Sequence, residues 1–421
     1  MRSRSRSKPN RFQTFLSPWQ DMDSFLLLLT VALTVLGGIM IRSTELKGGW
    51  TEWWQHWLTG ALGLALTLGL TRFRYEYLLR WQWIVYGTTC VSLLAVRFVG
   101  TEALGAQRWI SIGGFNVQPS EFAKLGAIIV LAASLSVHTA STLSGLARAL
   151  LIISLPWALV FIQPDLGTSL VFGCVTLVML YWANANPGWL LIMGSPLISA
   201  ILFAQYLPTW FAWVALVTLI AWKTLPWSQL AGLVVMVGNL LAGGLGNWLW
   251  FNLLKDYQRD RLILFMDPDK DPLGGGYHLI QSRIAIGAGE MWGRGLYHGT
   301  QTQLDFIPEQ HTDFIFSAIG EELGFVGAGL TLVIFWLICL RLVVIAQNAK
   351  DNFGSLLAIG VLGMIVFQLM VNVGMTIGLA PVTGIPLPWL SYGRSALLTN
   401  FIAIGLVESV ANHRHRGKNM F

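Results

Sequence analysis

Residues 25–41 read FLLLLTVALTVLGGIMI, and this stretch decides the fold class of the chain. It carries no charge, and with its flanks it reaches the length of about 20 mostly apolar residues that a helix needs to cross a bilayer. No small-residue A-x-A-like exit follows it, so a cleavable signal peptide is not indicated. We therefore predict that a first transmembrane helix begins here.

The rest of the chain has the same apolar character. Of 421 residues, 54% are hydrophobic and only 11% are charged, and the mean hydropathy of +0.60 excludes a soluble protein. We expect an all-α polytopic membrane protein with about twelve transmembrane helices and a large extracytoplasmic loop. The segment 209–222 is short enough to be re-entrant instead. The further predicted spans lie near residues 54–71, 81–99, 121–138, 149–163, 167–184, 188–206, 209–222, 227–250, 317–340, 355–380 and 395–411.

The formal charge of +6 is concentrated in the two tails. Residues 1–12 hold five Lys or Arg and no acid, residues 413–418 hold three more basic residues, and the remainder has 19 basic and 21 acidic residues. This distribution does not support a basic groove, so no nucleic-acid partner is expected. Basic residues number 15 on the side of the termini and six in the short segments opposite, which predicts cytoplasmic termini. The expected domains are a basic arm (1–23), a transmembrane domain (24–411) and a short tail (412–421).

A stretch rich in charge separates the ninth and tenth predicted spans. Residues 251–316 contain 15 of the chain's 48 charged residues and fall on the extracytoplasmic side. Three further polar loops, at 102–121, 163–165 and 381–393, fall on the same face. Loops rich in Gly, Pro and polar groups that meet on one face are typical of a site rather than of plain connectors. We therefore expect the functional site on the outer face.

Glu121 and Lys124 begin an otherwise apolar span and are close enough on a helix to pair. Charges at membrane depth tend to face a bundle interior or a water-filled cavity. Two interpretations stay open: a structural ion pair at the helix end, or a cavity wall in which Lys124 meets an anion such as pyrophosphate. Gln368 and Asn372, four positions apart in the eleventh span, are expected to make interhelical hydrogen bonds.

Asp313 stands where the large loop runs into the tenth span, in HTDFIFSAIGEELGFVG (311–327). An Asp at this place could be a simple helix N-cap. Other acids lie close to it in the sequence, and a carboxylate at a cavity mouth can become a general base or hold a divalent cation. Glu321 and Glu322 cannot point the same way on a helix, so we expect at least one of them to cap, pair or line the cavity.

The loop segment 256–283 supplies Arg259, Arg261 and Arg283, whose guanidinium groups suit phosphate binding. Its acids do not form a calcium loop, because Pro272 stands where the pattern requires Gly. We interpret the segment as turns in a solvated loop. Zinc-ligand spacing is also absent among the nearby histidines and the cysteines of the chain: His278, His298, His311, Cys90, Cys174 and Cys339.

Several long motifs, in order along the chain, resemble the SEDS family of bacterial cell-wall assembly. The resemblance runs from about residue 24 to 410. Its GYH-x2-QS and GTQ-x-Q segments are similar to the elongation branch of the family rather than to the division branch. The motifs are AQRWISIGGFNVQPSEFAKL (106–125), QPDLGTSL (163–170), DYQRDR (256–261), the segment from DPLGGGYH to DFIF (271–316), EELGFVG (321–327) and GIPLPWLSYG (384–393).

The resemblance implies a peptidoglycan glycosyltransferase that polymerises lipid II during cell elongation, on the outer face of the bacterial cytoplasmic membrane. A class B penicillin-binding protein, a transpeptidase, would work beside it in the elongation machinery and crosslink the new strand. The family's essential acid falls on Asp313, and its E-x-x-K pair falls on Glu121 and Lys124. The other positions at which we expect substrate contacts are Arg108, Gln118, Asp165, Arg259, Gln281, Ser391 and Tyr392.

The implied reaction has definite chemical needs. Lipid II carries an α-linked undecaprenyl pyrophosphate and the product strand is β-1,4-linked, so one inverting displacement is required. Such a transfer needs a base for the acceptor 4-hydroxyl and cationic neutralisation of the leaving pyrophosphate. We expect Asp313 to be that base or to hold a divalent cation, Mg²⁺ or Mn²⁺, and we expect no organic cofactor. Lys124 and the loop arginines are the expected pyrophosphate partners.

Two features depart from the family pattern. Members usually have ten spans, with only one between the QPDLG helix and DYQR, whereas residues 185–254 have room for three. Arg394 follows SYG where the family usually has a second Gly, which weakens the transfer of roles to the preceding Ser and Tyr. Two other functions fit a polytopic chain: a lipid II flippase, and a non-enzymatic scaffold for the transpeptidase. Two observations count against the flippase: polar groups are concentrated on one face, and no inverted repeat is apparent.

Overall fold

The computed structural model describes residues 19–45, 53–103, 106–112, 115–252, 259, 263–265, 270–271, 276–304, 306–307 and 309–414. Most of the basic arm and of the short tail predicted at the two ends lies outside this part of the chain. The described residues are mainly helical, with three short strands. The predicted all-α class is therefore confirmed.

Long helices form at all twelve places where spans are predicted. By length and hydropathy, nine of the described helices can cross a membrane. One of the nine is α9, which contains the doubtful segment 209–222. α7 is apolar but shorter, α8 is apolar but is counted only over residues 187–203, and α3 is less apolar because its first turns hold Gln55, His56 and three Trp. The helices are α2 (Ser24–Thr44), α3 (Trp53–Arg72), α4 (Glu76–Val99), α5 (Pro119–Val137), α6 (Leu143–Ile162), α7 (Leu166–Trp182), α8 (Pro187–Gln205), α9 (Leu207–Thr224), α10 (Ser228–Asn252), α14 (Ile315–Gln347), α15 (Asn352–Ile377) and α16 (Arg394–His413).

Short polar residues set the start of several long helices. A side-chain oxygen at the N-cap accepts a hydrogen bond from an N–H group of the first turn, which the helix itself cannot satisfy. The residues that cap a helix in this way are Asp23, Thr142, Asp165, Asn186 and Asp351.

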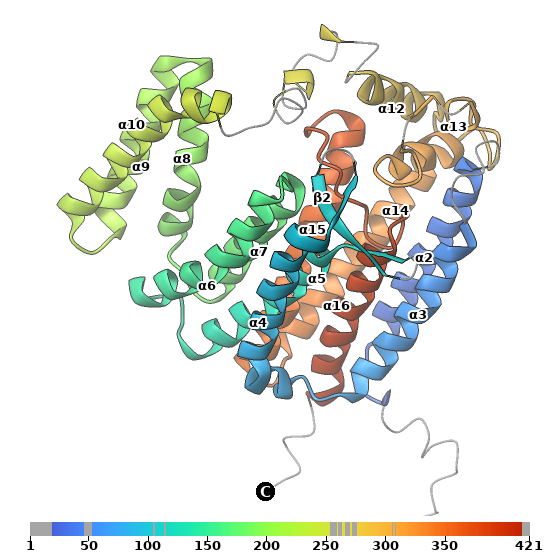
Figure 1. Cartoon of the computed structure of the whole chain (residues 1–421), viewed down its shortest axis with the longest axis horizontal. Helices are drawn as coiled ribbons and strands as arrows, with labels where there is room; N and C mark the ends of the chain where they lie inside the picture. The colour runs from blue at the N-terminus through green and yellow to red at the C-terminus, as the bar shows by residue number, and fades with distance from the viewer. Residues whose placement is uncertain are drawn as a thin grey trace, which may run out of the picture.

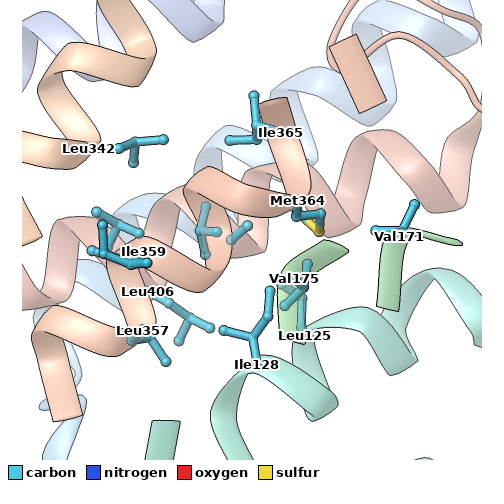
Figure 2. Close-up of a cluster of buried hydrophobic side chains, with 14 of the residues drawn as sticks. Leu125, Ile128, Val171, Val175, Leu342, Leu357, Ile359, Met364, Ile365 and Leu406 are labelled. Atoms are coloured by element: carbon cyan, nitrogen blue, oxygen red, sulfur yellow. The ribbon is translucent and has the colours of Figure 1, made fainter. Parts of the chain in front are cut away.

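The helices other than α8, α9 and α10 pack around a shared apolar core (Figure 1). α5 and α15 approach closely at Gly360, where a Cβ would lie 2.6 Å from Ile128 Cγ2. Close packing of this kind stabilises helices in lipid, where apolar burial alone contributes little to their association. Figure 2 shows part of the core, in which side chains from five helices gather: Leu125, Ile128, Val171, Val175, Leu342, Leu357, Ile359, Met364, Ile365 and Leu406.

α8, α9 and α10 form a three-helix unit at the side of the bundle (Figure 1). Polar side chains join the three helices: Asn239 Nδ2 donates to Ser195 Oγ (3.0 Å), and Trp210 Nε1 donates to Ser199 Oγ (2.7 Å). The main contact of the unit with the rest of the chain is between α7 and α8. The prediction that residues 185–254 hold three helices is therefore confirmed.

Smaller elements lie at the end of the bundle that carries the polar loops. The loop predicted at 102–121 instead contains a three-stranded antiparallel sheet in the order β1–β2–β3. Its last two strands are in register, with Ile110 opposite Val117. These elements are β1 (Thr101–Ala103), β2 (Ala106–Ile112), β3 (Phe115–Val117), α12 (Tyr277–Ala288) and α13 (Thr300–Gln303).

The start of α2 and the end of α16 lie together at the opposite end of the bundle. The N–H of Asp23 donates to Glu408 Oε2 (2.7 Å), and the Asp23 carboxylate accepts from Arg341 Nε (2.7 Å) in α14. The location of both termini in the cytoplasm stays a prediction.

A kink interrupts α14 at Gly324. Its backbone angles, φ 67° and ψ −167°, are not helical and belong to a region that almost only glycine adopts. The loop formed by residues 289–295 lies against the kink, and its own Gly293 also has a positive φ of 83°. Four backbone hydrogen bonds join this loop to the kink: Arg294 N to Glu321 O (2.9 Å), Gly295 N to Glu322 O (3.0 Å), Phe325 N to Glu290 O (2.9 Å) and Val326 N to Met291 O (3.1 Å).

Candidate functional site

The four polar loops predicted to share one face meet at one end of the bundle. The Arg108 guanidinium donates to the carbonyl oxygens of Gln163 (3.4 Å) and Pro164, which joins the first loop to the second. The N–H of Tyr392 donates to His311 O (2.9 Å), which joins the fourth loop to the long one. The predicted convergence of the loops is confirmed for these residues.

Asp313 is half-buried at this end, just before α14. The N-cap of α14 is Phe314 and receives no side-chain cap, so Asp313 is not the helix cap that its position allowed. The Asp313 N–H donates to Glu309 O (3.1 Å), and its carbonyl accepts from Asn372 Nδ2 (3.0 Å). Its carboxylate lies beside Gly384, where a Cβ would be 3.4 Å from Asp313 Oδ2. The acid therefore faces the backbone of the loop before α16.

Asp165 joins the first turns of α5 and α7. As the N-cap of α7 it accepts from Thr168 N (3.1 Å) and Thr168 Oγ1 (2.9 Å). Its Oδ2 also accepts from Gln118 Nε2 and Ser120 Oγ, both at 3.3 Å. The structure therefore brings two predicted site residues, Gln118 and Asp165, into contact. It also gives Asp165 a structural role that its position in the QPDLG motif did not reveal.

Glu121 and Lys124 form an ion pair inside the bundle. Lys124 Nζ lies 2.7 Å from Glu121 Oε2, and both side chains are buried. Two opposite charges that satisfy each other in this way carry little net charge toward a ligand. The structure thus shows the first of the two interpretations, the ion pair, while a contact between Lys124 and substrate stays a prediction.

Ser391 and Tyr392 shape the loop that precedes α16. Ser391 is buried, and its Oγ accepts from Leu387 N (2.8 Å) within the turn. Tyr392 Oη donates to Gln55 Oε1 (3.0 Å) on α3, and its ring lies 5.8 Å from the ring of His311. Both predicted residues therefore connect segments of the site.

Glu321 and Glu322 are both buried, and both bind segments at the end of the bundle that carries the polar loops. Glu321 accepts four hydrogen bonds, from the N–H groups of Gln301 and Thr302 and from two hydroxyls at 2.6–3.0 Å, and so holds α13 in place. Glu322 Oε1 accepts from Ser43 Oγ (2.6 Å) at the end of α2. The expectation that at least one of them pairs is confirmed for both.

Three residues of the site were not predicted. Ser395 Oγ accepts from Gln118 N (3.1 Å) and so joins the first turns of α16 and α5. Its neighbour Arg394, which departs from the family pattern, is the first residue of α16. Gly384, with φ 74°, lies beside the Asp313 carboxylate. The glycine in GIPLP was the one available signal, because a glycine before two prolines is typical of a turn.

Gln281 and Arg259 are the remaining predicted contact residues. Gln281 lies on α12 within one turn of His278, whose ring stacks at 6.1 Å on Phe314. Arg259 is described, but most residues around it in sequence are not. The prediction for Arg261 lies outside the described residues. Within the described part of the chain, no three His, Cys, Asp or Glu side chains gather as a metal site.

Four helices begin at the end of the bundle that carries Asp313 (Figure 1). α5, α7 and α16 start in contact through Gln118, Asp165 and Ser395, and α14 starts one residue beyond Phe314. The first turns of α5, α14 and α16 receive no side-chain cap. Uncapped first-turn N–H groups and the positive end of the helix dipole favour anions. The site can therefore combine one carboxylate with a surrounding field that suits a phosphate group.

The sequence matches the profile of the cell cycle protein family of FtsW, RodA and SpoVE over residues 19–209 and 197–416. Peptidoglycan glycosyltransferase MrdB of Escherichia coli K12 is 34% identical, with 93% of this chain and 94% of that protein covered. Peptidoglycan glycosyltransferase RodA of Treponema pallidum is 36% identical, covering 93% and 97%. Stage V sporulation protein E of Bacillus subtilis is 31% identical, covering 93% and 97%.

Solved structures agree with these sequence relatives. A chain from a study of how a peptidoglycan synthase complex coordinates polymerization and crosslinking superposes with a TM-score of 0.71 at 30% identity, covering 94% of this chain and 100% of that one. Rod shape determining protein RodA of Thermus thermophilus gives a TM-score of 0.62 at 25% identity, covering 94% and 99%. The two matched ranges overlap at residues 197–209, within α8 and the start of α9 in the three-helix unit. The extent and identity of these matches show that the chain belongs to the FtsW, RodA and SpoVE family.

Proposed function

We propose that this protein, a peptidoglycan glycosyltransferase like its relatives, polymerises lipid II into β-1,4-linked glycan strands with release of undecaprenyl pyrophosphate. Relatives named MrdB and RodA are 34–36% identical to the chain, and those named FtsW are 30–32% identical. The higher identity to MrdB and RodA than to FtsW supports a role in cell elongation. The observation that carries the proposal is that Asp313 directly precedes α14, at the end of the bundle where α5, α7 and α16 begin in contact with one another.

Asp313 is the base in this proposal. The acceptor 4-hydroxyl would approach the half-buried carboxylate, which takes its proton as the oxygen attacks the donor sugar on the face opposite the pyrophosphate. The Asn372 amide binds the backbone carbonyls of Asp313 and Ile385, and Gly384 leaves room beside the carboxylate. Asp313 thereby keeps a defined position while the reacting groups approach from the open end.

The leaving pyrophosphate needs positive charge, and the helix first turns supply it. The uncapped starts of α5, α14 and α16 lie around Asp313, and Arg394 opens α16. Anions bind at such helix starts because several N–H groups point toward them. Arg394 therefore adds charge where related chains usually carry glycine, and the loop arginines, Arg259 among them, would contribute more.

A divalent cation fits this site only in combination with substrate. No described group of three side chains would hold a metal by itself. Mg²⁺ is commonly held by one or two carboxylates together with substrate phosphates and water. Asp313 would be the protein ligand of Mg²⁺ or Mn²⁺, and the ion would neutralise the pyrophosphate. No organic cofactor is needed for the transfer.

The orientation proposed here places Asp313 on the outer face of the cytoplasmic membrane and both termini in the cytoplasm. The excess of Lys and Arg near the termini supports it, 15 against six in the short segments opposite. A class B penicillin-binding protein is the proposed partner, since the structurally similar chain comes from a complex that couples polymerization to crosslinking.

The decisive experiment uses the purified chain with its cognate transpeptidase, lipid II and a divalent cation. Glycan strands should appear with the wild type and be lost in Asp313→Asn, which keeps the shape of the side chain but removes the base. An inactive wild type would refute the polymerase and leave the scaffold, whereas lipid II transport across vesicles without polymer would favour the flippase. Full activity of Asp313→Asn would exclude Asp313 as the base.

A further inference from the structure

Asn372 lies on α15, and its side chain contacts the backbone of Asp313. Its side chain is fully buried, and its Nδ2 donates two hydrogen bonds, to Asp313 O (3.0 Å) and to Ile385 O (2.8 Å). The two carbonyls belong to segments far apart in sequence, the end of the long outer loop and the loop before α16. One amide group therefore holds together the two segments between which the acid lies.

The loop before α16 lies beside the Asp313 carboxylate. Gly384 precedes the carbonyl-bearing Ile385, and a Cβ on Gly384 would lie 3.4 Å from Asp313 Oδ2. A side chain at position 384 would thus be in van der Waals contact with the carboxylate. If Ile385 moved away from Asn372, the backbone beside the Asp313 carboxylate would change.

Few side chains can replace this amide. Two carbonyl acceptors require two N–H donors on one atom, which a carboxylate lacks and a hydroxyl provides only singly. Leu has a similar shape but no donor, and Asp adds a charge beside the acid. The chemistry of the contact therefore distinguishes Asn from its near-isosteres.

We infer that Asn372 is a positioning residue for Asp313, which holds the acid against the loop before α16 through two carbonyls. The inference rests on the proposed function, because it assigns the base of that reaction its support. Asn372 itself touches neither the reacting hydroxyl nor the pyrophosphate in this assignment.

The chain offers a matched control for this residue. Asn239 on α10 is also buried, and its Nδ2 likewise donates two hydrogen bonds, to Ser195 Oγ (3.0 Å) and Val235 O (2.9 Å). It lies in the three-helix unit, away from Asp313 (Figure 1). Asn239→Leu therefore repeats the loss of two buried hydrogen bonds without touching the site.

The experiment measures polymerisation rate against lipid II concentration for Asn372→Leu, Asn372→Asp and Asn239→Leu. Asn372→Leu should lower kcat by about 10- to 100-fold with KM within about 2-fold, because displacing a catalytic group by about 1 Å can cost that much. Asn372→Asp should lower kcat to a similar degree, because a carboxylate has no N–H donor for either carbonyl. Asn239→Leu should leave kcat and KM at their wild-type values.

A second measurement does not depend on activity. Hydrogen exchange of the backbone at 383–387 should become faster in Asn372→Leu and stay at the wild-type rate in Asn239→Leu. Wild-type exchange together with wild-type kcat in Asn372→Leu would overturn the inference, as would an equal loss of kcat in Asn239→Leu. An inactive wild type would refute the proposed function, whereas the exchange rates would still test whether Asn372 holds the loop.

Discussion

Replacing Gly324 by Ala should destabilise the protein strongly. The backbone there lies in a region that almost only glycine adopts, which costs another residue about 1–3 kcal/mol. The new Cβ would also lie 2.2 Å from Gly293 N and 2.6 Å from Trp292 C, too close for any rotamer change to relieve. Overpacking of this kind costs about 1–3 kcal/mol more. We therefore expect a total loss of about 2–6 kcal/mol.

Gly329→Ala is the matched control, five positions further along the same helix. A Cβ at Gly329 meets nothing within 4 Å, so this variant should gain up to about 1 kcal/mol from the better helix propensity of Ala. Thermal unfolding in detergent, followed by tryptophan fluorescence, would compare the two. Gly324→Ala should also lose polymerase activity, because the loop at 289–295 must move. Equal melting temperatures for the two variants would refute the assignment of strain to the kink.

Three further predictions concern other buried polar contacts. Glu321→Ala should lower stability by about 3 kcal/mol, because it leaves the donors of α13 without their acceptor, and a melt unchanged from wild type would contradict this. Lys124→Met should cost about 3–5 kcal/mol by isolating the buried Glu121 carboxylate, whereas adding Glu121→Leu should restore most of that loss in the same melt. Tyr75 lies outside the spans, and its pKa is raised first by burial and then by the charge of Asp351. The hydroxyl therefore stays protonated and donates to Asp351 Oδ2 (3.1 Å). Tyr75→Phe should cost about 1 kcal/mol with activity unchanged, and a loss of polymer would contradict a purely structural role.

The spans could be predicted because most of the apolar runs are long enough to cross a bilayer and are bounded by polar residues. The sheet at 101–117 was missed, since its strands are only three to seven residues long and lie between glycines in a polar segment. The kink at Gly324 was also missed. Glycine is common in membrane helices, and only the loop at 289–295, which precedes it by some thirty residues, reveals why this one breaks the helix.

The site was predictable at the level of topology and motif. Loops on one side of the membrane must share a face, and this brought Asp313, Gln118 and Asp165 into the same prediction. The contacts themselves depend on distant packing: Asn372 and Asp313 are 59 positions apart, and Gln118 and Ser395 are 277 apart. Periodicity within one helix carries no information about such partners.

The kink in α14 bears on how the chain enters the membrane. Four backbone groups at the kink have their partners in the loop at 289–295 rather than in the helix. In hydrocarbon, each of these groups would cost several kcal/mol if left unsatisfied. Because the loop is synthesised before α14, its polar partners exist as soon as the helix leaves the ribosome. Insertion of this helix therefore need not wait for any later span, provided that the preceding loop has already been translocated.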